Sequence, residues 1–535
     1  MQIALLCLTL IVLAGCTGPE SARLNADEAT LGVLARKEIE LRGASNPVEL
    51  ATPADRLYAT LVDATTGLAL PTATASLELR SVLALAARNS RDLQAAKETL
   101  QLAALDYLAQ AQRFNTLPFM LGNVDGTAAE TGDSVAYGGD LGLTRLFENG
   151  ASAAATFALS GLRLAGGNLD FASNLNLSIA LPLLRNSGLN LAREGLTQAD
   201  RDVLYAWRSF ERTKQSLVVQ TLSSYLELLS GRQRVANEEA NVASLQKARD
   251  RNVALFEEGR IGIVEVDQAR QQVLTADNRL VLAKLNVERS MDQVKLLLGL
   301  PVDMLLQVRA EDLDGLGALL RDSWMPQERA ALLAAMRQRF DLRNSVDAVT
   351  DSARRVLLSE EQLLPGLDLN VALDLPSAAG KPLRYDSTDS IWTGGLDLDF
   401  GIDKRAESYD LRGADVALVQ SLRRQEVQVE SVKAEVRDAL RGLSAARNSW
   451  GIAEEAVKLA ERRAASTLEL LEEDRAITRD YLESQEALIR SQNDLVDAAV
   501  EYHIAWLRLF RDTGTLVVAP GGLDYELSRK LLESE

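Results

Sequence analysis

The single histidine, His503, is the residue with the clearest catalytic potential, because an imidazole can act as a general base or bind zinc. It lies beside Tyr502 and Ala505 in an apolar stripe, with no cysteine or carboxylate cluster at ligand spacing. This context disfavours a catalytic zinc and a His-based triad. The chain also lacks a glycine-rich phosphate-binding loop. The sequence therefore predicts a protein that is not an enzyme and uses no cofactor or metal.

Cys16 offers a different chemistry, acylation of its thiol. It follows an apolar run of roughly fourteen residues, which is too short to span a bilayer and is typical of a secretion signal. Leu13-Ala14-Gly15-Cys16 resembles the lipobox of bacterial lipoproteins, and Thr17 after the cysteine favours an outer-membrane destination. No Lys or Arg precedes the run, so a plain signal peptide is the alternative. We predict a lipoprotein signal peptide over residues 1–15 and lipid attachment at Cys16.

Composition limits the class of protein. The 535 residues carry a formal net charge of −18, which argues against a nucleic-acid partner because nothing offsets phosphate repulsion. The chain has only 12 prolines and 5% aromatic residues. Its abundant Ala, Leu, Glu, Arg and Gln indicate long helices rather than several ordinary domains.

An internal duplication organises most of the chain. Residues 181–299 match residues 396–514 without gaps at an offset of 215, most clearly where LFEEGRIGIVEVDQARQQVLTADNRLVLA aligns with LLEEDRAITRDYLESQEALIRSQNDLVDA. Upstream, Leu117-Pro118 resembles Leu364-Pro365 at an offset of 247, so the first repeat holds 32 extra residues (247 − 215). The insert contains Asn149-Gly150, a two-residue hairpin signal between alternating runs. One additional hairpin is therefore predicted in the first repeat.

Several short segments alternate between apolar and polar residues. In LDLNVALDL, residues 367–375, the leucines and Val371 occupy one parity, and aspartate, asparagine and alanine the other. Residues 174–181 and 391–402 repeat the pattern, which is typical of a strand with two different faces. A soluble sandwich and a transmembrane barrel both accommodate such strands.

Long helical patterns follow each strand region, over residues 190–257 and 403–473, and each is expected to extend on the order of 100 Å. After a short interruption, return helices run to near Gly299 and Gly514, with seams at spacings of three and four that favour coiled-coil packing over a cofactor site. Two further helices are predicted over residues 76–116 and 326–363. Four to six strands cannot close a transmembrane barrel, so copies of the chain would have to share one.

The order of helix, strands, long helix, tip and return helix, present twice, resembles that of TolC-like outer-membrane efflux proteins. The runs PLLRNSG (182–188) and FEEGRIGIVEVDQAR contribute to the resemblance. It implies a mostly α fold with a membrane β-barrel part: a homotrimer whose shared barrel continues as an α-helical periplasmic tube. It also implies a lipid-anchored outer-membrane exit duct of a tripartite efflux or type I secretion system. The partners would be a periplasmic adaptor, an inner-membrane pump of RND or ABC type, and outer-membrane lipid. A lipid-anchored structural coiled-coil protein is the alternative.

The same resemblance implies a division of the chain. After the signal peptide, the expected parts of the chain are an N-terminal periplasmic (equatorial) segment over 16–75, a first repeat over 76–299, a linker over 300–325, a second repeat over 326–514 and a C-terminal equatorial tail over 515–535.

Functional residues are implied at the helix-hairpin tips and just after the second tip. By position in the family, the adaptor-contact tips are Gly259, Arg260, Ile261 and Gly262, and Asp474, Arg475, Ala476 and Ile477; simple turns are the alternative. Family members place acidic residues facing the pore axis after the second tip, and AITRDYLESQ aligns Asp480 and Glu483 there. Spaced by three, they share a helix face, and three-fold symmetry would gather six carboxylates around one axis. An ordinary solvated acidic face is the competing interpretation.

Overall fold

The computed structural model describes most of the chain and divides it into two compact units. The described residues are 19–42, 75–77, 79–127, 134–164, 169–304, 306–308, 324–378, 381–473, 475–519 and 522–533. Unit 1 comprises Met1–Val48, Thr99–Trp207 and Asn344–Gln425; unit 2 comprises Glu49–Glu98, Arg208–Arg343 and Glu426–Glu535. Each unit therefore combines residues of both repeats. Among the described helices, none is both long and apolar enough to cross a bilayer. Cys16 and the predicted signal peptide lie outside the described residues.

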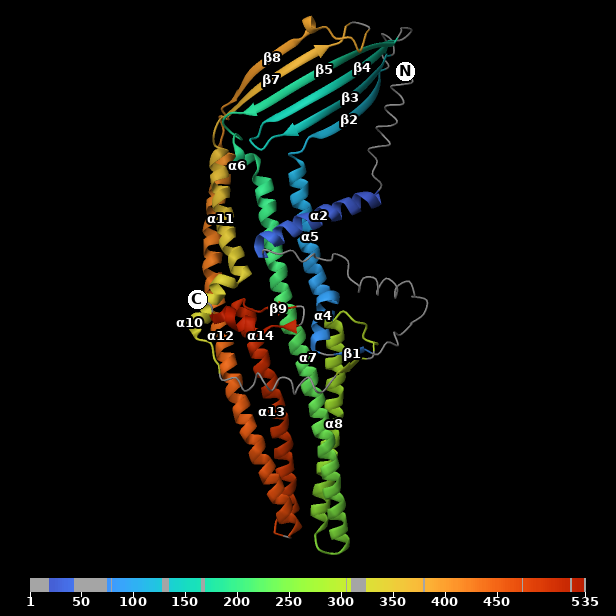
Figure 1. The fold of residues 1–535 in the computed structure, drawn as a ribbon, viewed down its shortest axis with the longest axis vertical. Coiled ribbons are helices and arrows are strands. Elements are labelled where there is room, and N and C mark those ends of the chain that lie inside the picture. Colours follow the sequence, from blue (N-terminus) through green and yellow to red (C-terminus); the bar gives the residue numbers. More distant parts are fainter. Residues whose placement is uncertain are drawn as a thin grey trace. The chain divides into compact units, whose positions relative to one another are not determined.

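Unit 1 contains a six-stranded antiparallel sheet with the strand order β2-β3-β4-β5-β7-β8 (Figure 1). The first repeat supplies four strands and the second supplies two, and the pairing of β5 with β7 joins them. The predicted strands are confirmed, and six is the number that one chain contributes to this sheet. Their bounds are β2 Leu117–Thr127, β3 Ser134–Leu146, β4 Ser152–Leu164, β5 Leu169–Pro182, β7 Gly366–Pro376 and β8 Ile391–Asp399.

The hairpin predicted in the first repeat is the β3–β4 pair. Its loop is longer than the two-residue turn expected from Asn149-Gly150, because Leu146 pairs with Ser152 and the N–H of Phe147 donates to the carbonyl of Ala151 at 2.7 Å. Gly150 adopts a positive φ of 87°, and the Asn149 Oδ1 accepts from the N–H of Ala151 at 3.1 Å. The two residues make the turn, but Phe147 and Ala151 extend it.

The register gives the sheet two chemically distinct faces. Leu177 of β5 lies opposite Leu373 of β7, which lies opposite Trp392 of β8. On the other face the Asp374 carboxylate accepts hydrogen bonds from the Asn174 and Asn176 side chains at 3.1 and 2.8 Å. The alternation predicted for residues 367–375 thus continues into the neighbouring strands, since directly opposed residues in an antiparallel pair point to the same side.

Cysteine labelling tests which face meets water. If the polar parity lines a water-filled lumen, Ala372→Cys will react with a membrane-impermeant maleimide in intact outer membranes, whereas Val371→Cys will not react because its neighbours of the same parity meet lipid. We expect at least about a tenfold difference in labelling rate. Equal labelling of the two positions would contradict the orientation, and denatured samples provide the control for intrinsic reactivity.

The helices fall close to the predicted ranges but are interrupted where continuous helices were expected. The segment predicted as 76–116 is two helices separated at Ser90, and that predicted as 326–363 is two helices separated at Arg339. The bounds are α2 Pro19–Arg42, α4 Leu79–Asn89, α5 Arg91–Gln112, α6 Leu189–Ala192, α7 Glu194–Glu257, α8 Ile263–Leu297, α10 Glu328–Gln338, α11 Phe340–Glu361, α12 Arg405–Glu472, α13 Thr478–Thr513 and α14 Tyr525–Glu533. Short paired strands complete the described fold: β1 Ala75–Leu77 with β6 Leu306–Val308, and β9 Val518–Ala519 with β10 Gly522–Leu523.

Helix α2 was not predicted from the sequence. It packs within unit 1, where Lys37 Nζ donates to the Asp200 carboxylate at 2.8 Å and the Asp27 carboxylate accepts from Gln101 at 3.0 Å. Val33 and Leu34 are buried on the same helix.

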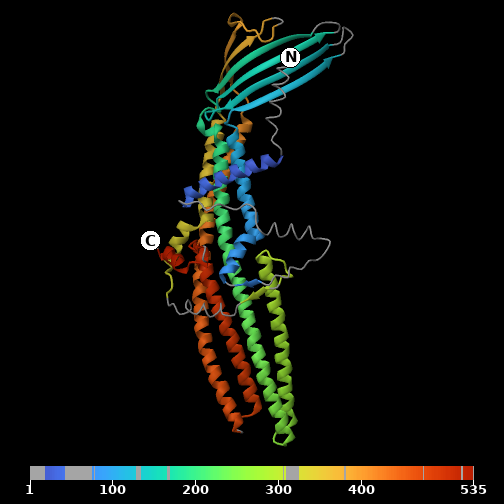
Figure 2. The same ribbon diagram turned by 45° about the vertical axis from the view of Figure 1, so that its right-hand side comes forward.

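Within unit 2, each long helix runs alongside its return helix (Figures 1 and 2). The long helices α7 and α12 have 64 and 68 residues, which matches the predicted length of on the order of 100 Å. The predicted seam of α8 is buried at Val266, Ala269, Val273 and Ala276. Small residues there allow close approach, as Gly231 of α7 shows: a Cβ would lie 3.2 Å from Val287. This is the coiled-coil packing that the sequence predicted.

Each return helix ends at a glycine that packs against a helix interruption. Gly299 has a φ of 65°, and a Cβ there would lie 2.2 Å from the carbonyl oxygen of Asn89, the last residue of α4. Gly514, the equivalent residue of the second repeat, has a φ of 74°, and a Cβ would lie 3.1 Å from the carbonyl carbon of Gln338, the last residue of α10. The duplication thus extends to two joints, which we call the first and second joint.

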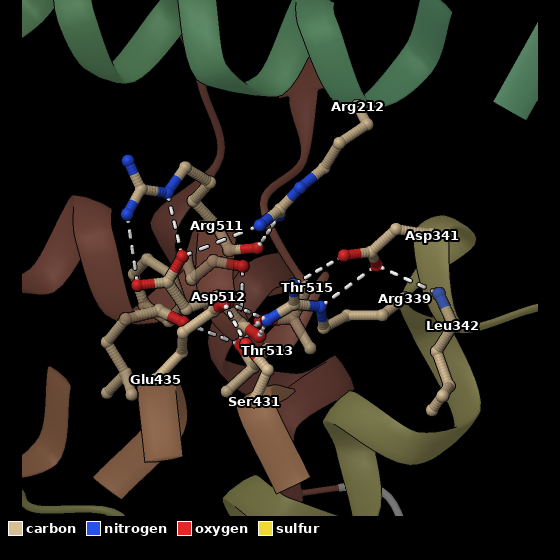
Figure 3. A network of polar contacts seen from close by, with 12 residues as sticks. Arg212, Arg339, Asp341, Leu342, Ser431, Glu435, Arg511, Asp512, Thr513 and Thr515 are labelled. Carbon is tan, nitrogen blue, oxygen red and sulfur yellow. Dashed lines mark hydrogen bonds and ion pairs between the residues drawn. The ribbon is translucent and has the colours of Figure 1, made fainter. Parts of the chain in front are cut away.

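Charged residues hold the second joint together (Figure 3). Arg339, 3% exposed, binds Asp341 through two hydrogen bonds of 3.0 and 2.5 Å and Glu435 of α12 through one of 2.5 Å. It also donates to the carbonyl of Asp512 at 3.3 Å. Asp341, in the first turn of α11, in turn accepts from the N–H of Leu342 at 3.0 Å, one of the N–H groups that have no partner within the helix. The interruption at Arg339 therefore lets one side chain link α11, α12 and the end of α13.

Candidate functional site

The tip of the first hairpin is a glycine turn. Gly259 has a φ of 75°, and the N–H of Arg260 donates to the carbonyl of Leu255 at 2.9 Å. Ile261 is half-buried, and Gly262 is the N-cap residue of α8. The Arg260 guanidinium lies 3.8 Å from the Glu258 carboxylate, with both side chains at least half exposed. This geometry explains Gly259 as a turn residue and leaves the guanidinium accessible.

The tip of the second hairpin closes in the same way. The N–H of Arg475 donates to the carbonyl of Leu470 at 2.8 Å, the bond equivalent to that of Arg260. The Arg475 guanidinium lies 3.1 Å from the Glu473 carboxylate. Ala476 is half-buried, and Ile477 is the exposed N-cap residue of α13. Asp474, the remaining predicted tip residue, lies outside the described residues.

The arginine retained at both tips has a local partner that sequence reasoning missed. In each tip it pairs with the glutamate two residues earlier. Exposed pairs of this kind contribute at most about 1 kcal/mol, so the pairing accounts for the orientation of the arginine more than for its presence. The sequence signal was available, because Glu258 and Glu473 also match in the duplication.

The predicted gate residues lie at the start of α13, within its first two turns. Both are exposed. Glu483 is 3.0 Å from Arg463 of α12, an ion pair inside its own hairpin. Among the described residues the Asp480 side chain has no ion pair, and its place in the first turn suits the positive end of the helix dipole. The structure thus brings the two carboxylates to one accessible part of the helix but gives Glu483 a counter-charge that the sequence did not predict.

Polar contacts between the two hairpins lie next to these residues, and sequence reasoning missed them. Asn252 of α7, 2% exposed, accepts from the Thr478 hydroxyl of the second hairpin at 3.2 Å and donates to the carbonyl of Glu265 in its own hairpin at 3.1 Å. Arg251 donates to the carbonyl of Leu471 at 2.9 Å, and the hydroxyls of Ser244 and Tyr481 are 3.2 Å apart. Polar residues within an otherwise apolar seam were the available signal. A movement of the start of α13 away from α7 has to break the contacts of Thr478 and Tyr481.

A polar groove of about 540 Å³ lies further along unit 2, between α7, α8 and α13. Asp497 accepts from the Ser230 hydroxyl at 2.8 Å and pairs with Arg234, and Asn237 donates to Asn493 at 2.8 Å.

The single histidine, His503, is 1% exposed, and its ring centre lies 6.5 Å from that of Tyr502. Among the described residues no group of three His, Cys, Asp or Glu side chains could hold a metal ion.

Removing both predicted gate carboxylates is expected to ease conduction. In planar bilayers, Asp480→Ala with Glu483→Ala should roughly double the single-channel conductance or abolish block by divalent cations, because a ring of carboxylates binds such ions. The matched control is Glu461→Ala with Glu469→Ala, which removes two exposed carboxylates of α12 in the same hairpin. Unchanged conductance and unchanged block would remove the gate assignment.

Comparison with known proteins shows which solved structures have a similar fold. No family model and no curated protein sequence matches the chain. Among solved structures, the Campylobacter jejuni CmeC outer membrane channel is similar with a TM-score of 0.59 and 16% identity, over 84% of this chain and 88% of that one. The outer membrane protein VceC of Vibrio cholerae is similar with a TM-score of 0.59 and 14% identity, over 82% and 96%. The open state of the Neisseria gonorrhoeae MtrE outer membrane channel has a TM-score of 0.57 and 12% identity, over 82% and 88%.

The architecture of duplicated strands and helical hairpins is the fold of these outer-membrane channels. The chain has the TolC-like fold, as the sequence resemblance predicted. Its structural neighbours include outer-membrane channels.

Proposed function

We propose that this protein is the outer-membrane exit duct of a tripartite efflux or type I secretion system. It acts as a passive conduit, and three copies share one β-barrel that continues as a periplasmic helical tube. A periplasmic adaptor contacts the hairpin tips, and an inner-membrane pump of RND or ABC type supplies the energy. The alternative, a lipid-anchored structural coiled-coil protein, accounts for the helical hairpins but gives no role to the two-faced sheet.

The observation that carries this proposal is the six-stranded sheet with an apolar face and two open edges. β2 and β8 end the strand order, and each pairs on one side only among the described residues. Every residue of β8 is exposed in the single chain, including Trp392, Leu396 and Leu398. In lipid, each unpaired backbone group costs several kcal/mol, so an open sheet there needs another strand at each edge. Pairing β8 of one copy with β2 of the next supplies it.

Attachment at the membrane is part of the same proposal. The lipobox-like sequence before Cys16 supports acylation of this residue and an outer-membrane location facing the periplasm. Lipid and barrel together would hold the protein in the outer membrane.

Crosslinking in outer membranes followed by mass identification tests the assembly. A barrel shared by three copies predicts a trimer band and adaptor peptides crosslinked near Arg260 or Arg475. A deletion strain should lose export and become sensitive to dyes and drugs. A monomer without β-sheet signal in its circular dichroism, or a deletion strain with unchanged export, would reject the exit-duct function. Solubility of Cys16→Ser without detergent would instead support the structural coiled-coil protein.

A further inference from the structure

A hollow of about 500 Å³ lies on the apolar face of the six-stranded sheet. Ala153 and Ala155, successive residues of β4 on this parity, are its small residues, and Ala155 lies between Leu143 of β3 and Leu177 of β5. Further lining residues are Phe147, Ile179, Val371, Leu373 and Trp392. Two alanines in a row between larger side chains leave space on a face where neighbouring positions are filled.

Arg145 is the one charged side chain among the lining residues. It lies opposite Ala153 and is exposed, with its guanidinium carbon 5.0 Å from the centre of the Phe147 ring. Among the described residues it forms no ion pair. Glu148, the nearest acidic residue along the chain, pairs instead with Arg193 at 3.2 Å. Arg145 therefore brings an uncompensated positive charge to an otherwise apolar hollow.

Register places Arg145 at the end of the sheet where the helices join it. The preceding residue, Thr144, lies opposite Leu117, the first residue of β2, and α5 ends shortly before β2, at Gln112. Figure 1 shows the strands and helices meeting at this end. In the proposed channel the helices extend into the periplasm. This end of the sheet therefore meets the periplasmic leaflet, and the hollow extends from Arg145 toward the middle of the bilayer.

The chemistry of the hollow matches that of an amphiphile with an anionic head. An arginine that faces lipid is unfavourable at the middle of the bilayer and tolerated near the interface. There its planar guanidinium can donate two hydrogen bonds to one phosphate group. The apolar hollow beside it fits an acyl chain, which gains from every methylene group that it buries. An arginine that only reaches toward the interface would need no such hollow.

We propose that this hollow binds one anionic phospholipid of the periplasmic leaflet per copy of the chain. The phosphate lies on the Arg145 guanidinium, and an acyl chain lies over Ala153 and Ala155. The inference rests on the proposed function, which places the apolar face in lipid, and it adds a specific lipid ligand to that function. Charge complementarity selects an anionic head group, because Arg145 has no carboxylate to neutralise it.

Quenching of tryptophan fluorescence by dibrominated phosphatidylglycerol tests the site, because bromine quenches on contact and Trp392 lines the hollow. The full-length protein in nonionic detergent should show saturable quenching, and Trp392→Phe should remove it. Arg145→Gln removes the charge and should weaken the apparent affinity about tenfold. Ala155→Leu fills the hollow and should abolish the saturable component. Circular dichroism verifies that each variant is folded, and Arg145→Gln, at an exposed position, still tests the site if Ala155→Leu does not fold.

The controls separate the possible failures. Arg405→Gln changes another exposed arginine near the helix end of the sheet, which already pairs with Asp403, and should bind the lipid like the wild type. A dibrominated diacylglycerol with the same chains but no phosphate should bind at least about tenfold more weakly.

Two outcomes would contradict the lipid site in different ways. Equal affinity of the wild type, Arg145→Gln and Ala155→Leu, or equal binding of the diacylglycerol, would overturn the lipid site and leave the proposed function standing. Absence of any tryptophan quenching in vesicles of brominated phosphatidylcholine would show that the sheet does not lie in lipid. That result would reject the proposed function together with the site.

Discussion

Replacing Arg339 with alanine is expected to lower the free energy of unfolding by about 3 kcal/mol, because it leaves the carboxylates of Asp341 and Glu435 without their cation at the second joint. Arg339 is almost fully buried and makes four hydrogen bonds there, whereas its partners are partly exposed, which places the loss at the low end for a buried pair. Thermal unfolding of detergent-purified protein, followed by circular dichroism at 222 nm, measures it.

The matched control is Arg437→Ala. Arg437 pairs with Glu328 at 2.7 Å, but both side chains are about half exposed, so the expected loss is below about 1 kcal/mol. Equal losses in the two variants would show that the buried network contributes no more than a surface ion pair.

The pH dependence of stability gives a second readout of the same network. Burial would raise the pKa of Asp341, but hydrogen bonds and charge from Arg339 outweigh it and hold the pKa below its ordinary value. A carboxyl with a lowered folded-state pKa contributes stability above its unfolded pKa, about 3.9. That contribution is lost as the pH falls through the lowered folded value. In Arg339→Ala, this acid-sensitive component should shrink.

Gly299→Ala is expected to destabilise unit 2 by about 3 kcal/mol. The alanine would have to keep the left-handed backbone conformation of Gly299, and its Cβ would collide with the carbonyl oxygen of Asn89. Gly514→Ala should have a smaller effect, about 2 kcal/mol, because the nearest backbone atom is 3.1 Å away. The melting temperature of each variant provides the comparison.

Gly442→Ala serves as the matched control for both glycine variants. Gly442 lies inside α12, with open space where a Cβ would be. Alanine there should raise stability by about 0.5–1 kcal/mol, since glycine is the weaker helix former. A Gly299→Ala protein that melts at the wild-type temperature or above would refute the close packing of the first joint.

The sequence missed the joints because their cause is not local. Ser90 interrupts α4 and α5, and its hydroxyl is 3.5 Å from the N–H of Leu93, yet a serine inside a helical pattern is common and breaks few helices. Arg339 is a good helix former by itself. At each interruption the end of a return helix packs against the break. The residues that make this contact are far away in the chain: Gly299 is about 210 positions from the first joint's Asn89, and Gly514 is about 175 positions from Arg339.

In the candidate site, too, the sequence predicts some features and the packing of helices decides others. The duplication located both tips, and the arrangement of Gly259 and Arg260 follows from turn chemistry that a sequence displays. The ion pair between Glu483 and Arg463 depends on how the two helices of one hairpin align, and the contact of Asn252 with Thr478 depends on how the two hairpins align side by side. Helical periodicity identifies the face on which a residue lies, but the opposing residue depends on the stagger between helices.

The sequence by itself determined the elements and their repetition. Period-two alternation identified the strands, three-and-four spacing identified the coiled-coil seams, and the constant offset identified the two repeats, because each is a local or repeated pattern of burial. Only the tertiary structure decided the strand order, the pairing of β5 with β7 that joins the two repeats, and the charged network at Arg339. These depend on register between distant segments, which is fixed by the packing of the whole unit and not by any single stretch of chain.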